Sequence, residues 1–257
     1  MAENNALRLH PLPTREISAH GIYEDLELPP ACGHRRASRR PYVLINMVSS
    51  LDGRTTVEGK ALSIGSETDR QVMRTLRSKA DAVMIGANTL RAERLSLGLD
   101  EPARSQPIAV ILTNTGNLPL QSNLIRHERQ KVLVLVPESC PEEAMRGLSR
   151  RSDVLRSPTT RCGAIDIEEA LKVLRAEHAV ELLLVEGGPT LNHAMISRNL
   201  ADELFLTLAP KLLGGSRNEA LGILKGQPVS PEEPRLVNLL SVHAAGDELF
   251  LRYKFGP

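Results

Sequence analysis

Short aliphatic runs alternate with segments of helical periodicity along most of this chain. The runs cover residues 42–48, 80–85, 108–113, 131–136, 180–185 and 203–208 and are rich in Val, Leu, Ile and Ala. A continuous apolar run of this length is typical of a strand that is covered on both faces. Because strands that alternate with helices form parallel sheets, the pattern predicts an α/β domain with a mostly parallel sheet and helices on both sides.

The segments between these runs carry helix signals. Helices are predicted over residues 66–79, 141–150 and 166–177 and from residue 189 onward. Ser66 is placed as an N-cap with Asp69 three residues later, an acidic variant of the capping box, and Asp166 caps the third helix. Near the C-terminus, residues 236–240 and 248–254 flank a Gly-Asp turn and predict an antiparallel strand pair.

The ends of the predicted strands carry small or polar residues. They are Ser49 to Gly53, Gly86 to Thr89, Thr113 with Asn114, and Glu186 to Thr190. Ligands of open parallel sheets bind at the carboxyl ends of strands, so these segments are expected to lie along one crevice.

The stretch from Val185 to Thr190 is the most informative of these strand ends. A carboxylate, Glu186, follows an aliphatic strand, and two glycines then lead into a helix that Pro189 opens. Glycines allow the backbone to approach a ligand closely, and proline suits the first helical turn. Since a helix N-terminus attracts phosphate, the stretch predicts a nucleotide pyrophosphate site with an acid beside it.

Composition excludes several other classes of function. The net charge is +1, from 32 basic and 31 acidic residues, and aromatic residues make up 2% with no Trp. Such a chain has neither the field nor the stacking surfaces that favour nucleic acid, and no run is long enough to span a membrane. The cysteines, Cys32, Cys140 and Cys162, are odd in number and far apart. They predict neither a disulfide framework nor a metal site, and they favour the cytoplasm.

Two regions are expected. Residues 1–40 contain several prolines and a basic run, and are predicted to form a partly ordered N-terminal arm. Residues 41–257 are predicted to form the main domain.

Taken together, these segments resemble the reductase domain of riboflavin biosynthesis, which follows a zinc deaminase in bifunctional bacterial enzymes. The resemblance is carried by residues 40–46, 50–53, 76–89, 185–191, 201–204 and 209–215. It implies a three-layer αβα fold like that of dihydrofolate reductase, a homodimer, and NADPH as cofactor. It also implies reduction of the ribosylamino side chain of a pyrimidine 5′-phosphate to a ribitylamino chain. Because residues 1–40 are too short for the deaminase, a reductase alone is expected.

The resemblance also assigns residues to roles. Glu186 and Asp52 are the expected catalytic carboxylates, and these two with Arg77 and Asn46 are expected to bind the substrate. The expected cofactor-binding residues are Thr89, Glu93, Thr113, Asn114, Gly187, Gly188, Pro189, Thr190 and Leu191. No resident metal is expected.

Two segments depart from the family pattern. Relatives read Asp-Asp-Pro-x-Leu where this chain has Glu93 to Leu97, and Asp100 stands near the place of an arginine that contacts substrate. Arg94 and Arg104 are candidates to replace that arginine. Residues 63–66 also lack the aromatic residue that often follows the Asp-Gly loop. These departures leave two alternatives open: a reductase of the same fold that acts on another pyrimidine, a pterin or an imine, and a non-catalytic binding protein.

Overall fold

The fold is described from a computed structural model. It describes residues 5–28, 39–56, 64–93, 96–99, 105–119, 121–122, 124, 129–215, 221–229 and 234–256. The chain divides into two compact units. The first contains Met1–Leu28, Val43–Leu76 and Pro189–Pro257, and the second contains Pro29–Tyr42 and Arg77–Gly188.

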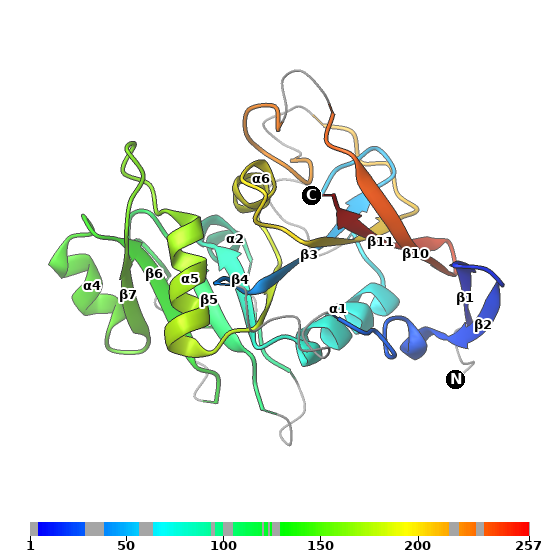
Figure 1. Cartoon of the computed structure of the whole chain (residues 1–257), viewed down its shortest axis with the longest axis horizontal. Coiled ribbons are helices and arrows are strands. Elements are labelled where there is room, and N and C mark those ends of the chain that lie inside the picture. Colours follow the sequence, from blue (N-terminus) through cyan, green and yellow to red (C-terminus); the bar gives the residue numbers. More distant parts are fainter. Residues whose placement is uncertain are drawn as a thin grey trace. The chain divides into compact units, whose positions relative to one another are not determined.

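The first unit has strands in the order β2-β1-β10-β11-β9-β3. Their bounds are Arg15–Ser18, Asn5–His10, Val237–Ala245, Glu248–Phe255, Glu203–Ala209 and Tyr42–Ser50. Neighbouring strands run antiparallel except β3 and β9, which are parallel. In Figure 1 the blue β1–β2 pair lies beside the β10–β11 hairpin. This unit also contains helix α6, Pro189–Ser197, and a 3-10 turn, Ala19–Gly21.

A cluster of rings lies within the core of the first unit. Tyr23 contacts Phe205 edge to face with ring centroids 5.0 Å apart, and contacts His243 at 5.2 Å. Because an edge-to-face contact places the positive edge of one ring on the negative face of another, it adds to the stabilisation from burial. Burial is the main cause that lowers the pKa of His243 to about 4, so this imidazole is neutral at pH 7.

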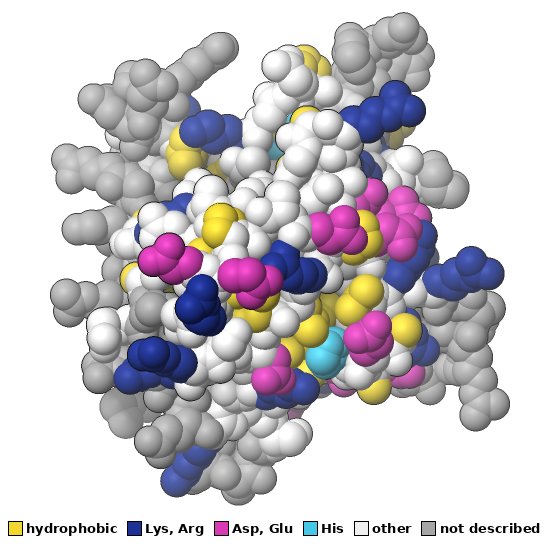
Figure 2. Space-filling model, turned by 90° about the vertical axis from the view of Figure 1, so that its left-hand side faces the viewer, with side chains coloured by type: hydrophobic (Ala, Val, Ile, Leu, Met, Phe, Trp, Pro, Cys, Tyr) yellow, Lys and Arg dark blue, Asp and Glu magenta, His cyan; other side chains and the backbone are white. Residues whose placement is uncertain are grey.

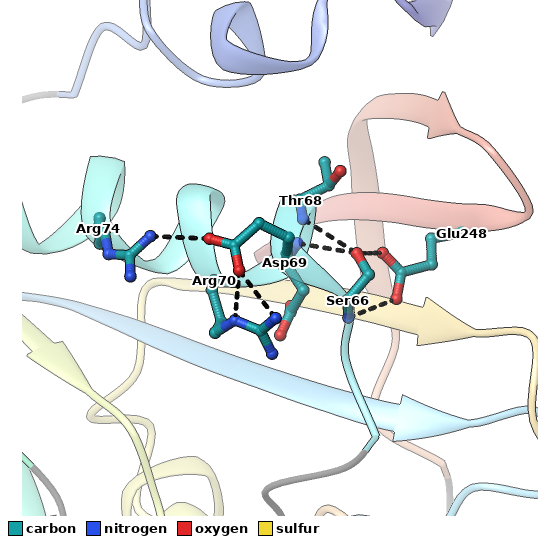
Figure 3. Close-up of polar contacts among 7 residues, drawn as sticks. Ser66, Thr68, Asp69, Arg70, Arg74 and Glu248 are labelled. Carbon is teal, nitrogen blue, oxygen red and sulfur yellow. Dashed lines mark hydrogen bonds and ion pairs between the residues drawn. The ribbon is translucent and has the colours of Figure 1, made fainter. Parts of the chain in front are cut away.

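Helix α1, Glu67–Lys79, is fixed at its start by a polar cluster (Figure 3). Ser66 Oγ accepts hydrogen bonds from the backbone N–H groups of Thr68 and Asp69, which confirms Ser66 as the N-cap. The N–H of Ser66 donates to Glu248 Oε1 at 3.0 Å, and its hydroxyl donates to the other oxygen of Glu248. In a capping box, the side chain of Asp69 would accept a hydrogen bond from the N–H of Ser66. Here the carboxylate of Glu248, on β11, accepts that hydrogen bond.

The second unit has strands in the order β8-β4-β5-β6-β7. Their bounds are Leu182–Val185, Ala82–Gly86, Ile108–Leu112, Val132–Pro137 and Asp153–Ser157. Every neighbouring pair is parallel. The helices are α2 (Ala87–Ala92), α4 (Glu142–Leu148) and α5 (Ile167–His178), and Asp166 caps α5 by accepting from the N–H of Glu168.

The order of these strands reverses at one place. From β4 the chain moves outward through β5, β6 and β7, and it then returns to β8 on the other side of β4. The carboxyl ends of β4 and β8 thus flank a topological switch point, where the connecting segments leave in different directions. Open α/β sheets bind their ligands at such a point.

Most elements predicted from the sequence are present. The aliphatic runs form β3, β4, β5, β6, β8 and β9, and the predicted C-terminal pair is β10 with β11. The parallel pairs together with this hairpin confirm the predicted α/β class. Three strands were not predicted, namely β1, β2 and β7. In the predicted N-terminal arm, β1 pairs with β10; the boundary at residue 40 stays a prediction.

Among the described residues on the face drawn in Figure 2, Lys and Arg side chains are interspersed with Asp and Glu side chains. Within the described ranges, no helix is both long enough and apolar enough to cross a membrane.

Candidate functional site

The glycine loop, defined as Gly187 and Gly188, continues directly from β8. The ladder between β4 and β8 extends into it, because the N–H of Glu186 donates to the carbonyl of Met84 at 3.0 Å and the N–H of Gly86 donates to the carbonyl of Gly187 at 2.9 Å. Gly187 has φ of +86°, a conformation that favours glycine, and a cis peptide bond joins the two glycines. The loop is therefore attached to the end of β4 at the switch point.

Thr89 lies against the glycine loop. A Cβ atom at position 188 would stand 3.0 Å from Thr89 Oγ1, closer than side chains normally approach. Thr89 belongs to α2, which starts directly after β4. The absence of a side chain at Gly188 therefore leaves backbone and a threonine hydroxyl together, a combination that suits a phosphate group.

A buried ion pair lies beside this loop. Arg77, on the last turn of α1, donates from Nε to Glu186 Oε1 and from Nη2 to Glu186 Oε2, both at 2.7 Å. The Arg77 and Glu186 side chains are 5% and 10% exposed. Arg77 Nη1 also donates to the carbonyls of Ser96 and Gly98, at 2.9 and 3.3 Å. One guanidinium thus joins the end of α1, the end of β8 and the segment 96–98.

This geometry changes what Glu186 can do. A two-bond contact between a guanidinium and a carboxylate is the strongest form of the pair, and it largely cancels the carboxylate charge. Removing either partner leaves a buried charge without compensation, at a cost of about 3–5 kcal/mol. The pair with Arg77 therefore fixes the backbone at Glu186, directly before the glycine loop. This holds whether or not Glu186 also contacts a ligand.

Asp52 is in a different environment. Asp52 is exposed in the turn after β3, where Gly53 has φ of +77°. Asp52 Oδ1 accepts from Ser50 Oγ at 2.5 Å and from the N–H of Leu213 at 3.1 Å, and Oδ2 accepts from the N–H of Gly214 at 2.7 Å. These bonds, that of Ser50 first, lower the pKa of Asp52 to about 2. Asp52 is therefore ionised at every pH where the protein is expected to work.

Thr113 and Asn114 follow β5, the strand next to β4. Thr113 is buried, and its Oγ1 accepts from the N–H groups of Thr115 and Gly116 at 3.4 and 3.2 Å. Asn114 is exposed, and its Oδ1 accepts from the N–H of Ile165 at 3.0 Å. Both side chains shape the loop at this strand end, and the Asn114 side chain also reaches the solvent.

The structure distributes the predicted residues between the two units. The second unit contains Arg77, Thr89, Glu93, Thr113, Asn114, Glu186, Gly187 and Gly188, and the first unit contains Asn46, Asp52, Pro189, Thr190 and Leu191. In the second unit, all of these except Arg77 follow the carboxyl end of a parallel strand. Asn46 is half-buried in β3, and Glu93 ends α2 as its C-cap. Helix α6 begins at Pro189, as predicted.

Some candidates lie elsewhere or were missed. Arg94, Asp100 and Arg104 lie outside the described residues. The carbonyls of Ser96 and Gly98, which hold Arg77, were not predicted, because any residue type supplies a carbonyl. Among the described residues, no group of three or more His, Cys, Asp or Glu side chains is arranged to hold a metal ion.

Comparison with known proteins places this chain in a family. The family model described as the RibD C-terminal domain matches residues 41–248. The chain therefore belongs to the RibD C-terminal domain family. The resemblance that the motifs indicated is thus confirmed.

Several relatives match over most of their length. A 2,5-diamino-6-ribosylamino-4(3H)-pyrimidinone 5′-phosphate reductase of Methanothermobacter thermautotrophicus is 29% identical over 218 residues, which cover 83% of this chain and 98% of the relative. A protein of the same name from Archaeoglobus fulgidus is 32% identical, covering 68% of this chain and 83% of the relative. The riboflavin biosynthesis protein RibD of Actinobacillus pleuropneumoniae is 26% identical, and the match spans 60% of its length.

Solved structures agree on the fold. RibD of Acinetobacter baumannii superposes with a TM-score of 0.71 at 25% identity, covering 87% of this chain and 60% of that one. A pyrimidine reductase-like protein of Corynebacterium diphtheriae superposes with a TM-score of 0.77 at 19% identity, covering 94% of this chain and all of the other. The predicted dihydrofolate-reductase-like α/β fold class is therefore confirmed.

The buried pair yields a prediction about stability. Arg77→Met and Glu186→Gln are each expected to lower the free energy of unfolding by about 3–5 kcal/mol, because each leaves its partner buried and unpaired. The double variant should lose less than the sum of the two. Urea unfolding followed by circular dichroism measures all three.

The matched control is the exposed pair of Lys131 and Asp153, whose atoms are 3.6 Å apart. Its removal is expected to cost at most about 1 kcal/mol. If Arg77→Met does not fold, Arg77→Lys is measured instead. It retains the positive charge but lacks the guanidinium that donates two parallel hydrogen bonds. The importance given to this pair would be contradicted if the losses in the free energy of unfolding were additive and no larger than those of the control pair.

Proposed function

We propose that this chain is an NADPH-dependent reductase of riboflavin biosynthesis. Its substrate would be a pyrimidine 5′-phosphate whose ribosylamino group becomes ribitylamino. The observation that carries the proposal is the glycine loop at the switch point of the parallel sheet, in a chain of the RibD C-terminal domain family. The names of the archaeal relatives support the same substrate class.

The choice of pyrimidine follows from the names and identities of the relatives. Those named for the 2,5-diamino pyrimidinone are 27–32% identical to this chain, and the RibD proteins are 25–28% identical. We therefore favour the 2,5-diamino compound over 5-amino-6-(5-phosphoribosylamino)uracil, the deaminated form.

The residues at the switch point fit a dinucleotide. Gly188 leaves open a place that a Cβ would fill beside the Thr89 hydroxyl, so backbone and hydroxyl are available to a phosphate oxygen. In this proposal Gly187, Gly188 and Thr89 hold the linked phosphates of NADPH. Pro189, Thr190 and Leu191 continue the contact at the start of α6, and Glu93, Thr113 and Asn114 contact the cofactor from α2 and β5. When bound, the nicotinamide supplies the reducing equivalent.

The two carboxylates take different roles. Opening of the ribosylamine ring gives an imine, whose protonated form accepts hydride at C1′ and becomes a secondary amine. A carboxylate that keeps its charge stabilises that cation. Asp52 keeps its charge, because its partners are neutral donors that lower its pKa to about 2. The charge of Glu186 is compensated by Arg77, so we give Glu186 and Arg77 the task of orienting the loop and the substrate, together with Asn46.

A second candidate function keeps the fold and the cofactor. The segment from Glu93 to Asp100 departs from the family pattern at the place of a substrate-contacting arginine. This observation favours a different acceptor, such as another pyrimidine, a pterin or an imine. A binding protein without catalytic activity is the remaining alternative, and turnover on any acceptor excludes it.

The function is tested by following NADPH absorbance with the diamino and the deaminated ribosylamino-pyrimidine phosphates. Oxidation is expected with the diamino compound. Asp52→Asn should lower kcat by about 100-fold, because charge stabilisation in the transition state is lost, while the Kd for NADPH stays unchanged.

The matched control is Asp247→Asn, in the exposed turn between β10 and β11, which should leave kcat unchanged. Full activity of Asp52→Asn would reject its catalytic role. NADPH binding without oxidation by either compound would favour the second candidate function or the binding protein.

We also propose that the chain forms a homodimer through one face of the first-unit sheet. Cross-strand register places Leu7, Leu249 and Leu208 in one row on this face and Leu251 with Leu206 in the next. Leu7 and Leu249 are 43% and 37% exposed, and the others are half-buried. The opposite face holds the buried Phe205 and Phe250. A continuous apolar face of this kind marks an interface, and a second copy presents the same apolar chemistry.

Sedimentation equilibrium tests the dimer. Leu251→Lys is expected to give a monomer, since it places a charge in the middle of the face. The control is Leu12→Lys, because Leu12 is 79% exposed and lies between β1 and β2; it should leave the dimer intact. A wild-type monomer at micromolar concentration would refute the proposal.

Two further assignments remain proposals: residues 41–257 as the reductase domain after an N-terminal arm, and the cytoplasm as its location. The scattered cysteines support the latter, since a reducing compartment keeps thiols free.

A further inference from the structure

Residues 221–227, which we call the strap, connect two parts of the first unit that the proposed function uses. One end of the strap pairs with the chain just after the turn that contains Asp52. The N–H of Thr55 donates to the carbonyl of Leu221 at 2.7 Å. The Thr55 hydroxyl shares its proton between the carbonyls of Leu221 and Gly222, each at 3.1 Å, and the residue is 2% exposed. The strap is thereby fixed against the Asp52 turn.

The other end of the strap lies on the first turns of α6, beside which it is the orange loop in Figure 1. The N–H of Lys225 donates to the carbonyl of Pro189 at 3.1 Å. His193 Nε2 donates to the carbonyl of Gln227 at 2.6 Å, and since a carbonyl only accepts, Nε2 carries the proton. Gly226 packs on the same ring, because a Cβ at this position would stand 2.4 Å from it.

Hydrogen bonds hold the strap more than burial does. Residues 224–227 are exposed, so the hydrophobic effect contributes little to their position. Between the two ends, Asn192 Nδ2 donates to the carbonyl of Ile223 at 3.2 Å, and Asn192 is fully buried. A segment held in this way keeps its place only while both ends are attached, so releasing either end releases the connection.

The two parts that the strap connects have different tasks in the proposed function. The start of α6 contacts the cofactor, and Asp52 stabilises the protonated imine that accepts hydride. Hydride transfer depends on how exactly donor, acceptor and the nearby charge are held, and a displacement of about 1 Å can lower the rate by about 100-fold.

We propose that the strap sets the position of the Asp52 turn relative to the start of α6, with Thr55 and His193 as its positioning residues; this inference rests on the proposed function. Each of the two residues holds one end of the strap, and neither needs to contact the substrate or the cofactor. The strap then makes the cofactor-binding helix and the charged turn one mechanical piece.

The test measures hydride transfer in a single turnover at saturating NADPH and diamino substrate. Thr55→Val and His193→Phe retain most of the side-chain volume and remove one attachment each. Each should slow the step by about 10-fold through misplacement, while the Kd for NADPH stays unchanged. The double variant should be no slower than the slower single variant, because one cut already frees the strap. Two independent local effects would multiply instead. Thr55→Ser, which keeps the hydroxyl, should restore the rate.

Hydrogen exchange gives a second readout that needs no turnover. NADPH is expected to slow amide exchange of residues 50–56 in the wild type, because binding at α6 steadies these residues through the strap. In His193→Phe, NADPH should bind with the same Kd but no longer slow exchange of residues 50–56.

The controls are Thr75→Val and His20→Phe. Thr75 donates to the carbonyl of Gln71 within α1, and His20 is exposed in the 3-10 turn, so both should leave the rate and the exchange unchanged. If a strap variant is not folded by circular dichroism, Thr55→Ala or His193→Leu replaces it.

An active wild type with rate effects that multiply, or with unchanged rates in both single variants, overturns the strap alone. A wild type that binds NADPH but oxidises it with neither compound overturns the proposed function, and the exchange of residues 50–56 then decides the strap. A wild type that binds no NADPH overturns both.

Discussion

The buried contact between Arg77 and Glu186 is the interaction on which the candidate site depends. Two charges that are almost removed from water persist only when they satisfy each other, and here both carboxylate oxygens face the guanidinium at 2.7 Å. The same guanidinium holds the carbonyls of Ser96 and Gly98. These contacts hold the end of β8, from which the glycine loop starts. A hydrophobic pair of similar volume could stabilise the fold equally well, but it would not hold segment 96–98 by hydrogen bonds.

The carboxylates that follow β3 and β8 differ in how far their partners compensate their charge. Glu186 meets a cation and forms a nearly neutral pair, which suits orientation. Asp52 meets one hydroxyl and two backbone N–H groups, which stabilise the carboxylate without cancelling its charge. Because of this difference, and not because of sequence position, we propose that Asp52 stabilises the protonated imine. It also means that Asp52 cannot act as a proton donor at neutral pH, since its pKa is about 2.

Much of the fold could be predicted because the signals are local. The aliphatic runs became strands, and Ser66 became an N-cap, since burial on both faces and cap geometry depend on adjacent residues. Strand β7 was missed because it is only partly buried and its sequence, Asp153 to Ser157, alternates weakly. The convergence of Thr89 and Gly188 also followed from the sequence, because parallel strands end at one edge.

The partner of Glu186 could not be predicted in the same way. Arg77 and Glu186 are 109 positions apart, and nothing in either segment specifies that they meet in a buried pair. Contacts of this kind require the tertiary structure, and they are the contacts that decide which charges remain available to a ligand.

A crystal structure of the chain with NADPH tests the central claim most directly. The account predicts the linked phosphates of the cofactor against the backbone of Gly187 and Gly188 and the Thr89 hydroxyl, with the pair of Arg77 and Glu186 intact. Cofactor bound at another edge of the sheet, or a glycine loop covered by protein so that no phosphate reaches it, would contradict the account.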